Sequence, residues 1–364
     1  MRICLIGKNL TNFVLAKVLV SKNLSLDIIY NSEDKKINSS RTIGISKDNF
    51  NFLNKKFKNL KISAWPIKKI KIYNENDNCN ELFEFYNGDK ENFFLIKYSE
   101  IYNYFHKYLI HNKNINFIKL KKNINENYLL NKNKYNLIIN SDVKSKITKK
   151  FFSKKIEKNY NSQAYTTIIN HKKIINNNVA VQIFTKFGPI AFLPFSNTKT
   201  SIVFSIFNKK IKDKNQIIEL IKKLNFKYVI KNIENFENFN LKFSILRNYH
   251  YKNILSFGDL LHKIHPLAGQ GFNMTIRDIK ILSNIIDKKL KLGLELDSSI
   301  FVEFEKKTKH RNYIFASSID FIHEFFKLDS NINNILSKRA FSIIGKNKML
   351  NQYATYFANF GIDL

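Results

Sequence analysis

Apolar residues recur along the first 66 residues in a pattern that predicts a strand, a helix, a second strand and a second helix. Residues 3–6 form an unbroken apolar run, which is typical of a strand covered on both faces. Residues 14–19 carry Val and Leu at helical spacing, and residues 26–30 form another apolar run. The segment 50–57 repeats its apolar positions at helical spacing. Strand, turn and helix in this order are typical of the start of a nucleotide-binding unit.

The pattern then changes to alternating apolar and polar positions, which predicts strands. Residues 67–85 alternate well enough for a pair of strands, with residues 74–80 as the turn between them. A helix is predicted at 99–110. Two more strands are expected at 115–120 and 137–139.

Between residues 155 and 247 the sequence predicts a second group of strands, interrupted by one helix at 216–224. An apolar run at 253–257 then leads back to the first unit. This order predicts an α/β fold, in which a Rossmann-like unit carries an inserted antiparallel sheet. The expected domains are a discontinuous nucleotide-binding domain at 1–66, 98–154 and 248–290, an inserted sheet domain at 67–97 and 155–247, and a C-terminal helical region at 291–364.

Three of the chain's 10 glycines lie where a helix is predicted to begin. Gly258 follows the apolar run at 253–257, while Gly269 and Gly271 precede a helix with one apolar face. Helix starts prefer Ser, Thr, Asp or Asn, so glycine here indicates a backbone that a ligand approaches closely. The unpaired amides of a helix start attract phosphate or the carbonyl edge of a flavin ring. Open α/β sheets also bind ligands at the carboxyl ends of their strands.

Two other interpretations of this segment stay open from its spacing. The glycines at 269 and 271 are compatible with an ordinary turn beside packed histidines. Asp259, His262 and His265 are also compatible with a metal site. Pro266 speaks against the metal site, because it interrupts the helical spacing that such sites often use.

The turn after the first strand carries an incomplete dinucleotide-binding fingerprint. Gly7 holds the first glycine position, but Asn9 and Asn12 stand at the second and third. Asparagine tolerates positive φ better than most residues, so we expect the turn to survive with looser phosphate contact. The acidic residue expected after the second strand is also absent, because Asn31 stands there, with Glu33 as a late substitute.

The formal net charge of the 364 residues is +32, which raises the question of nucleic-acid binding. The lysines are spread along the chain, and Lys, Asn, Ile, Phe and Tyr are abundant together, as expected from an AT-rich genome. We therefore expect no nucleic-acid partner. A basic surface does favour the anionic face of a membrane, so peripheral contact with the inner membrane is an expectation.

Cysteine content and hydropathy indicate a cytoplasmic protein. Cys4 and Cys79 are the only cysteines, which excludes a disulfide framework and a cysteine-based zinc site. No run of 18 or more apolar residues occurs, so no membrane-spanning helix is expected. The first 20 residues resemble a strand and a helix more than a signal peptide.

The residues after the last predicted strand follow a long and specific order. Gly258-Asp259 and His262 precede the run His265-Pro266-Leu267-Ala268-Gly269-Gln270-Gly271-Phe272-Asn273, and Arg277-Asp278 follow it. This order resembles the flavin-binding signature of the ubiquinone-biosynthesis aromatic-ring hydroxylases, FAD-dependent relatives of para-hydroxybenzoate hydroxylase. The blocks at 163–169, 179–185 and 188–195 are similar to substrate-domain strands of the same family, and the resemblance extends to about residue 287.

The resemblance implies a Rossmann-like FAD-binding domain with an inserted antiparallel-sheet substrate domain and C-terminal helices. It implies a flavin-dependent monooxygenase that hydroxylates the aromatic ring of a polyprenylated phenol in ubiquinone biosynthesis. A flavin hydroperoxide, formed when NAD(P)H-reduced FAD meets molecular oxygen, would deliver the oxygen atom. No catalytic side chain and no metal are then expected, because the cofactor supplies the chemistry.

Carried over residue by residue, the resemblance assigns cofactor binding to nine positions: Gly7, Arg41, Gly258, Asp259, Pro266, Gly269, Gln270, Gly271 and Asn273. The carboxylate of Asp259 would bind the ribityl hydroxyls, and Pro266 would cover a face of the ring. The substrate pocket is assigned to Phe192, Leu193 and Phe195, which are equally compatible with ordinary core packing.

Departures from the family gather on the adenine side of the cofactor. Besides Asn9, Asn12 and Asn31, the family's Asp-Gly pair appears as Asp142-Val143. Two hypotheses follow: FAD binds through its flavin side with reduced affinity, or the chain is a non-catalytic relative that serves as a scaffold in a quinone-biosynthesis complex. The glycines at the flavin edge favour the first, because they have no packing purpose in an empty scaffold. The ring position, the choice between NADH and NADPH, and the oligomeric state stay open.

Overall fold

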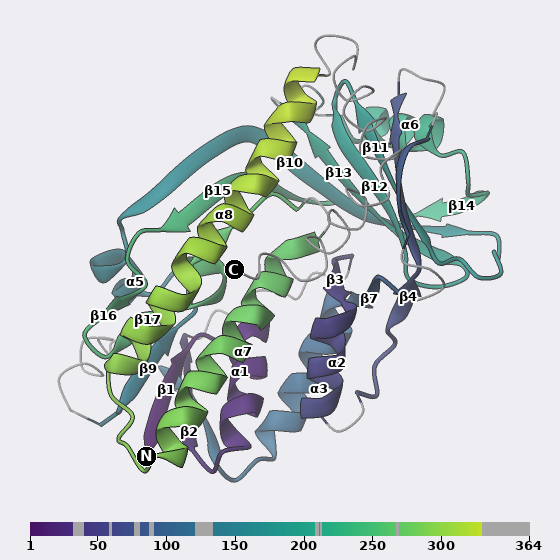
Figure 1. Ribbon diagram of the computed structural model, residues 1–364. Helices are drawn as coiled ribbons and strands as arrows, with labels where there is room; N and C mark the ends of the chain where they lie inside the picture. The colour runs from purple at the N-terminus through teal and green to yellow at the C-terminus, as the bar shows by residue number, and fades with distance from the viewer. Residues whose placement is uncertain are drawn as a thin grey trace.

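A computed structural model describes residues 1–31, 40–57, 60–75, 81–86, 91–120, 134–207, 211, 213–266 and 269–329. These residues form two sheet-based units, with a small third sheet between them (Figure 1). One long helix, α8 (Ser299–Asp329), runs alongside both units. The arrangement matters for function, because the segment rich in glycine lies where the two units meet.

The first unit is built on a six-stranded sheet, with the order β16-β17-β9-β1-β2-β8 among the described residues. Five of the strands are parallel, and β16 pairs antiparallel with β17. Its strands are β1 (Arg2–Ile6), β2 (Ser25–Asn31), β8 (Ile115–Leu120), β9 (Leu137–Asn140), β16 (His250–Tyr251) and β17 (Ile254–Ser256). Its helices are α1 (Leu10–Val20), α2 (Lys47–Lys56), α3 (Tyr98–Ile110), α5 (Lys146–Phe151) and α7 (Gln270–Lys291).

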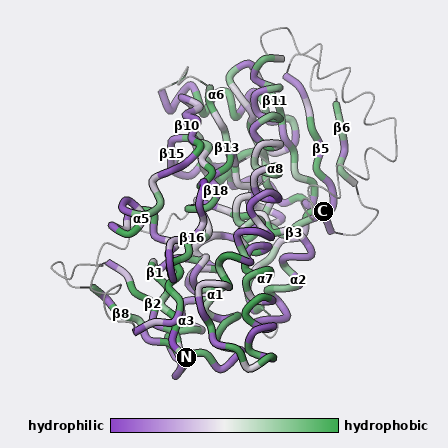
Figure 2. Tube along the Cα trace, turned by 60° about the vertical axis from the view of Figure 1, so that its left-hand side comes forward, coloured by the Kyte–Doolittle hydropathy of each residue, from purple (hydrophilic) through white to green (hydrophobic). Residues whose placement is uncertain are grey.

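The core of this unit explains why its strands read as unbroken apolar runs. Residues 3–6 of β1 are at most 3% exposed, because packed elements cover both faces of the sheet. The helix α1 contacts α3 and α7 and is buried almost all round. The helix α7 has one buried face, and apolar and hydrophilic residues alternate along it (Figure 2).

The second unit is a nine-stranded sheet with the main order β18-β15-β10-β13-β12-β11-β5-β6, in which β14 pairs with β10. All its described pairs are antiparallel except β11 with β5. The strands are β5 (Lys69–Asn74), β6 (Glu81–Tyr86), β10 (Lys155–His171), β11 (Val179–Thr185), β12 (Gly188–Pro194), β13 (Lys199–Ile206), β14 (Ile230–Ile233), β15 (Glu237–Leu246) and β18 (His262–Lys263). The helix α6 (Lys214–Leu224) covers one face.

The third sheet links the two units. It contains β3 (Thr42–Ser46), β7 (Phe93–Lys97) and β4 (Trp65–Ile67), in the order β3-β7-β4. An apolar cluster joins β4 and β7 to Ile168 and Ala180 of the nine-stranded sheet. In addition, β3 contacts α7. The small sheet therefore contacts the nine-stranded sheet on one side and α7 of the first unit on the other.

The predicted elements are found in the structure with small shifts at their ends. The helices expected at 99–110 and 216–224 correspond to α3 and α6, and the apolar run at 253–257 contains β17. The strand β10 has 17 residues and extends beyond the block at 163–169. Among the described residues, every helix is too short or too polar to span a bilayer.

Candidate functional site

Three neighbouring strands of the six-stranded sheet end side by side, and the segments after them form the candidate site. Gly7 follows β1, Ser141 follows β9 and Gly258 lies just after β17. The backbone N–H of Ser141 donates to the carbonyl of Ile6 at 3.0 Å, which joins two of these ends. Since the strands are parallel, all three segments lie at the carboxyl edge, where sheets of this kind bind ligands.

Gly258 opens a short 3-10 turn, η3 (Gly258–Leu260), with φ at +65°. A Cβ atom at this position would lie 2.9 Å from Cγ2 of Thr11 in the first turn of α1. Only glycine therefore lets the turn pack this closely on α1. The next residue, Asp259, is exposed at the sheet edge, where its carboxylate can accept hydrogen bonds from a ligand.

The start of α7 has a backbone cap in place of a side-chain cap. Gly269 is the N-cap in the left-handed conformation, with φ at 63°, and no side chain caps the helix. The N–H of Gly269 donates to the Pro266 carbonyl at 3.2 Å. Among the described residues, a Cβ atom on Gly271 would meet no heavy atom within 4 Å, so these residues leave space beside the first turn. A flavin ring could approach the helix start only if side chains leave this space free, and those of the described residues do so at Gly271.

Asn273 fastens the first turn of α7 to the small sheet. Its Oδ1 accepts from the N–H of Ser46 at 2.9 Å, and its Nδ2 donates to the Gly44 carbonyl at 2.9 Å. Asn49 donates to the same Oδ1 at 3.1 Å. Asn273 is 2% exposed. Its amide is thus committed to protein partners and positions the helix start.

The side chain of Gln270 also points to a protein partner. Its Oε1 accepts a hydrogen bond from Nη2 of Arg277 at 3.3 Å. Arg277 lies about two helical turns further along α7. The guanidinium of Arg277 lies 4.6 Å from the ring centre of Phe315 in α8. The Gln270 side chain is thus linked to α8 through Arg277.

A buried polar trio, which sequence reasoning left without a role, lies behind the site. His262 Nε2 is 2.9 Å from Oδ2 of Asp278, and the two side chains are 0% and 1% exposed. Asn312 of α8 donates to Oδ1 of Asp278 at 3.1 Å. Burial, followed by the charge of Asp278, raises the pKa of Tyr249 beside it. The trio ties β18, α7 and α8 together.

Arg41 lies beside an aromatic residue that the sequence analysis did not single out. Its guanidinium lies 4.8 Å from the ring centre of Tyr98, the first residue of α3. Burial is the main cause that raises the pKa of Tyr98, with Arg41 lowering it and Asp259 raising it. Arg41, Tyr98 and Asp259 therefore act on one another across the sheet edge.

His265, just before Pro266, packs into a buried group of rings on the side of the nine-stranded sheet. Its ring centre lies 4.2 Å from that of His323 in α8 and 5.6 Å from that of Tyr160 in β10. Burial, and then the neighbouring His323, hold the pKa of His265 well below its ordinary value. The hydroxyl of Tyr160 donates to Asp320 at 2.6 Å. The alternative of packed histidines thus holds for His265.

The three expected substrate residues do not share one face of the sheet. Phe192 packs in the apolar cluster under α6, on the outer face. Leu193 and Phe195 pack on the inner face, against Ile67 and Leu95 of the small sheet. Successive residues of a strand point to opposite faces, so Phe192 cannot line a pocket with the other two. We therefore keep only Leu193 and Phe195 as pocket candidates.

The inner face of the nine-stranded sheet carries a row of short side chains next to these two residues. Thr166 pairs with Val203, Val203 with Ala191, and Ala191 with Gln182, and directly paired residues share a face. Val203, Ala191 and Gln182 stay partly exposed, whereas their outward neighbours are buried. Ser40, just before Arg41, lies 3.3 Å from the Thr166 hydroxyl. Three of the four side chains in this row are therefore accessible from the inner face of the sheet.

The N-terminal turn is closed by its own side chains. Gly7 has φ at +113°, as the fingerprint predicts. Asn9 caps α1 through its side chain, which accepts from the N–H of Asn12 at 3.1 Å. The Asn12 amide is fully buried and donates to the carbonyls of Ile6 and Gly7 at 2.9 and 2.7 Å. The turn survives with asparagine at both positions.

Among the described residues, no carboxylate stands at the end of β2, where the fingerprint places the acidic residue. Asn31 ends β2 and is exposed, and Glu33 lies outside the described residues. Asp27 lies within β2, but Arg2 and the Tyr135 hydroxyl bind its carboxylate at 2.9 and 2.6 Å. At the end of β9, Val143 is 55% exposed.

The alternative metal site does not come together. Asp259 is exposed, whereas His262 is buried against Asp278. Within the described residues, no group of three His, Cys, Asp or Glu side chains is placed to hold one metal ion.

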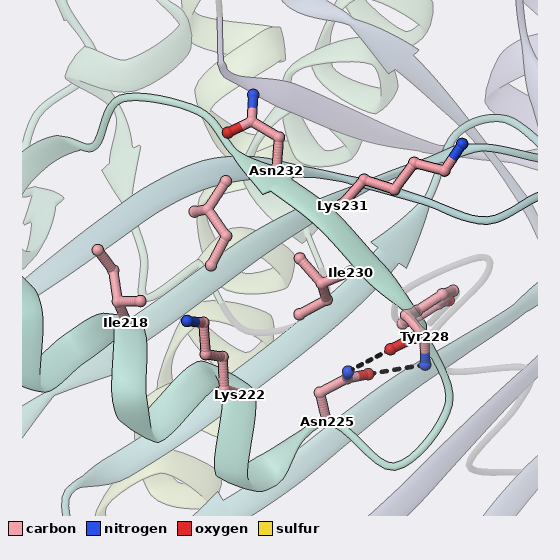
Figure 3. A pocket seen from close by; sticks show the side chains of 8 residues that line it. Ile218, Lys222, Asn225, Tyr228, Ile230, Lys231 and Asn232 are labelled. Atoms are coloured by element: carbon pink, nitrogen blue, oxygen red, sulfur yellow. Dashed lines mark hydrogen bonds between the residues drawn. The ribbon is translucent and has the colours of Figure 1, made fainter.

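A separate depression of about 480 Å³ lies between α6 and β14 (Figure 3). Lys222 and Lys231 line it, and the Asn225 side chain bonds the backbone of Tyr228 at its edge. None of the candidate site residues lines this depression, which lies on the α6 side of the nine-stranded sheet.

No family model matches the chain. Curated proteins similar to it are named ubiquinone biosynthesis monooxygenase COQ6, mitochondrial. The chain is 23% identical to that of Caenorhabditis elegans over 235 residues, which is 52% of each protein. It is 22% identical to that of Homo sapiens over 209 residues, 46% of this chain and 45% of that protein. The chain thus spans about half the length of these relatives, and the resemblance read from the sequence is confirmed.

Two solved structures have the same fold. The p-nitrophenol 4-monooxygenase PnpA from Pseudomonas putida DLL-E4 has a TM-score of 0.78 at 10% identity, covering 100% of this chain and 98% of that one. Klebsiella pneumoniae HpxO, complexed with FAD and uric acid, has a TM-score of 0.75 at 9% identity, covering 98% and 97%. The predicted fold class is therefore confirmed.

Proposed function

We propose that the chain is an FAD-dependent monooxygenase that hydroxylates the aromatic ring of a polyprenylated phenol in ubiquinone biosynthesis. The observation that carries this proposal is the start of α7, where a left-handed Gly269 replaces a side-chain cap and the described residues leave space beside Gly271. Similarity to the ubiquinone biosynthesis monooxygenases supports the substrate class, and the shared fold supports the cofactor.

The residues around α7 fit a flavin. Backbone amides in the first turn of α7 would donate to the electron-rich edge of the ring, where the helix dipole stabilises negative charge. Asp259 can accept hydrogen bonds from ribityl hydroxyls, and Gly258 lets its turn pack on α1. Asn273 holds the helix start in place through Ser46 and Gly44.

When bound, FAD would supply the activation of molecular oxygen, with NAD(P)H as the reductant. The chain's own task is to position the ring and to exclude water. Pro266 precedes the α7 start, and Arg41 with Tyr98 forms the opposite rim. Gly7 keeps the turn at the end of β1 in the conformation that a dinucleotide needs.

We propose that the phenol ring lies between the α7 start and the inner face of the nine-stranded sheet. Thr166, Val203, Ala191 and Gln182 form an uncharged row on this face. Thr166 is buried and the other three are partly exposed, so a ring can contact them. Leu193 and Phe195 would form the apolar end of this space. In this proposal, the segments 1–66, 98–154 and 248–290 bind the cofactor, and 67–97 and 155–247 bind the substrate.

We also propose peripheral contact with an anionic membrane, from which a polyprenylated phenol would be drawn. Ile314, Phe321 and Leu328 of α8 are 41%, 69% and 65% exposed. Their spacing of seven residues aligns them along one side of the helix. The net charge of +32 adds attraction to anionic lipids. Flotation with phosphatidylserine vesicles should recover the protein, and Phe321→Glu should reduce that fraction. Recovery that does not depend on Phe321 would contradict this surface.

A second candidate is a non-catalytic relative that acts in a quinone-biosynthesis complex. The side chain of Asn9, which closes the N-terminal turn, is the observation that favours it. The two candidates differ in their predictions for purified protein. The enzyme binds FAD and consumes NADH or NADPH when a prenylated phenol and oxygen are present. The scaffold does neither, and its spectrum stays unchanged when FAD is added.

A further inference from the structure

The side chain of Asn9 lies across the turn between β1 and α1. Its Oδ1 accepts from the backbone N–H of Asn12 at 3.1 Å. Its Nδ2 donates to the hydroxyl and the carbonyl oxygen of Ser141 at 2.9 and 3.2 Å. A Cβ atom on Gly7 would lie 2.9 Å from that Nδ2, so the amide rests directly against the turn.

These contacts lie at the start of α1, which is where a dinucleotide binds in folds of this kind. The pyrophosphate of such a cofactor accepts hydrogen bonds from the backbone N–H groups at this helix start. The second glycine of the fingerprint exists so that the phosphate can approach the backbone. Asn9 stands at that position, and its amide oxygen already accepts one of those N–H groups. A side-chain oxygen thus occupies the role of a phosphate oxygen.

The side chain of Asn12 stabilises the conformation of the turn. Its amide is fully buried and donates to the carbonyls of Ile6 and Gly7 at 2.9 and 2.7 Å. These bonds hold the strand end and the glycine turn together without a third glycine. The turn is therefore preformed, and the Asn9 amide closes its open side.

We propose that Asn9 is an internal substitute for the cofactor's pyrophosphate, and that FAD binds only when this side chain leaves the start of α1. This inference rests on the proposed function, because it concerns the same cofactor. When the Asn9 side chain moves away, α1 loses its cap and the hydrogen bonds to Ser141 break. The free energy of this loss weakens the binding of the FAD pyrophosphate. The flavin side then carries most of the binding.

The test compares FAD, FMN and riboflavin, which share the ring and differ in phosphate content. Each is titrated by flavin fluorescence into the full chain and into Asn9→Gly, Ser141→Ala and Asn23→Gly. Glycine is a nearly equivalent N-cap, so the first variant should fold. Asn23, with φ at 58° just after α1, is the matched control for an Asn-to-Gly change.

Asn9→Gly should bind FAD about tenfold more tightly than the unchanged chain. Its affinity for riboflavin should be unchanged, because riboflavin has no phosphate. Ser141→Ala should tighten FAD about threefold, because it removes one of the two oxygens that hold Asn9. Asn23→Gly should change none of the three affinities.

Equal FAD affinity in Asn9→Gly and the unchanged chain, with riboflavin bound by both, would overturn the inference and leave the proposed function standing. A chain that binds none of the three flavins, in any variant, would overturn both. If Asn9→Gly does not fold, the decision passes to Ser141→Ala, where unchanged FAD affinity would overturn the inference.

Discussion

The helices α1 and α7 both begin beside the carboxyl edge of the six-stranded sheet, but their first turns differ. In α7 a left-handed glycine forms the N-cap and no side chain caps the helix. In α1 the side chain of Asn9 accepts from the first turn and also bonds Ser141. A side-chain cap satisfies the helix start internally, whereas a glycine cap leaves its amides to a ligand. The difference teaches that one end of the candidate site is closed by a side chain, whereas the other is capped by backbone alone.

The largest effect is expected where the open start is anchored. Asp278→Ala leaves His262 buried without its partner and removes the acceptor of Asn312. Breaking a buried pair of this kind should lower the free energy of unfolding by about 3 kcal/mol, measured by urea denaturation. Asp48→Ala is the control, because Asp48 forms an exposed pair with Lys280 and should cost less than about 1 kcal/mol. Equal effects at both positions would refute the anchoring role.

Asp259→Ala tests the open side itself. Asp259 is exposed, so the free energy of unfolding should change little. The loss of a charged hydrogen-bond acceptor should weaken flavin binding about 100-fold, which leaves the purified variant colourless. Asp259→Asn keeps an acceptor oxygen and should recover part of the affinity. A yellow Asp259→Ala protein with unchanged affinity would remove Asp259 from the site.

Local patterns in the sequence predicted the open side well. The sequence marked the glycines at 258 and 269 as places where a ligand approaches the backbone, and in the structure both have positive φ, which glycine adopts readily. Helical spacing after Gly271 predicted α7, and the apolar run before Gly258 predicted β17. These features depend on neighbours in the chain, and the periodicity of a helix or strand records such neighbours directly.

Contacts between distant segments were not predictable in the same way. Asn9 and Ser141 are 132 positions apart, and their bond depends on how β1 and β9 pair. The trio around Asp278 joins three elements, and spacing alone does not show which polar residues face each other in a core. Phe192 was misplaced because a run of apolar residues does not reveal which face of the strand points inward.

Gly271→Ala should separate packing from binding at the open start. No heavy atom of the residues that the structure describes lies within 4 Å of an added Cβ, and alanine is a better helix former than glycine. The variant should therefore gain about 0.5–1 kcal/mol in unfolding free energy while binding FAD about tenfold more weakly. Thermal unfolding without ligand and a flavin titration measure the two effects. A variant with unchanged FAD affinity would show that the flavin does not approach Gly271.

Gly269→Ala is the companion variant. With φ at 63°, alanine at this position is strained, so the unfolding free energy should fall by about 1–2 kcal/mol. We therefore expect Gly269→Ala to lower the unfolding free energy and Gly271→Ala to raise it, because only Gly269 has a positive φ.

We also expect a smaller, pH-dependent effect on folding stability. It should come from histidines near α7, because Gly7, Asn9 and Asn12 at the start of α1 have no titratable side chain. Burial lowers the pKa of both His265 and His323 below the ordinary 6.5. The folded state therefore favours the neutral rings, and stability present above pH 6.5 is lost as the pH falls below it. Each histidine contributes at most about 1.4 kcal/mol per pH unit.

His323→Phe should flatten the fall in stability between pH 6.5 and 5.5, because phenylalanine keeps the ring packing against Tyr160 and His265. Nearby Asp320, Glu324, Lys158 and Lys327 stay in both proteins, so the difference reports the imidazole. His310→Phe, at an exposed position of the same helix, is the control. Parallel stability curves for the His323 variant and the unchanged chain would contradict the buried neutral ring.

The absorbance spectrum of the purified chain, with chromatographic identification of any cofactor released on denaturation, tests the central claim most directly. The account predicts a yellow protein, or a colourless one that takes on a flavin spectrum when FAD is added, and FAD as the released compound. A colourless protein whose added FAD keeps the spectrum and fluorescence of free FAD would contradict a flavin site at the start of α7.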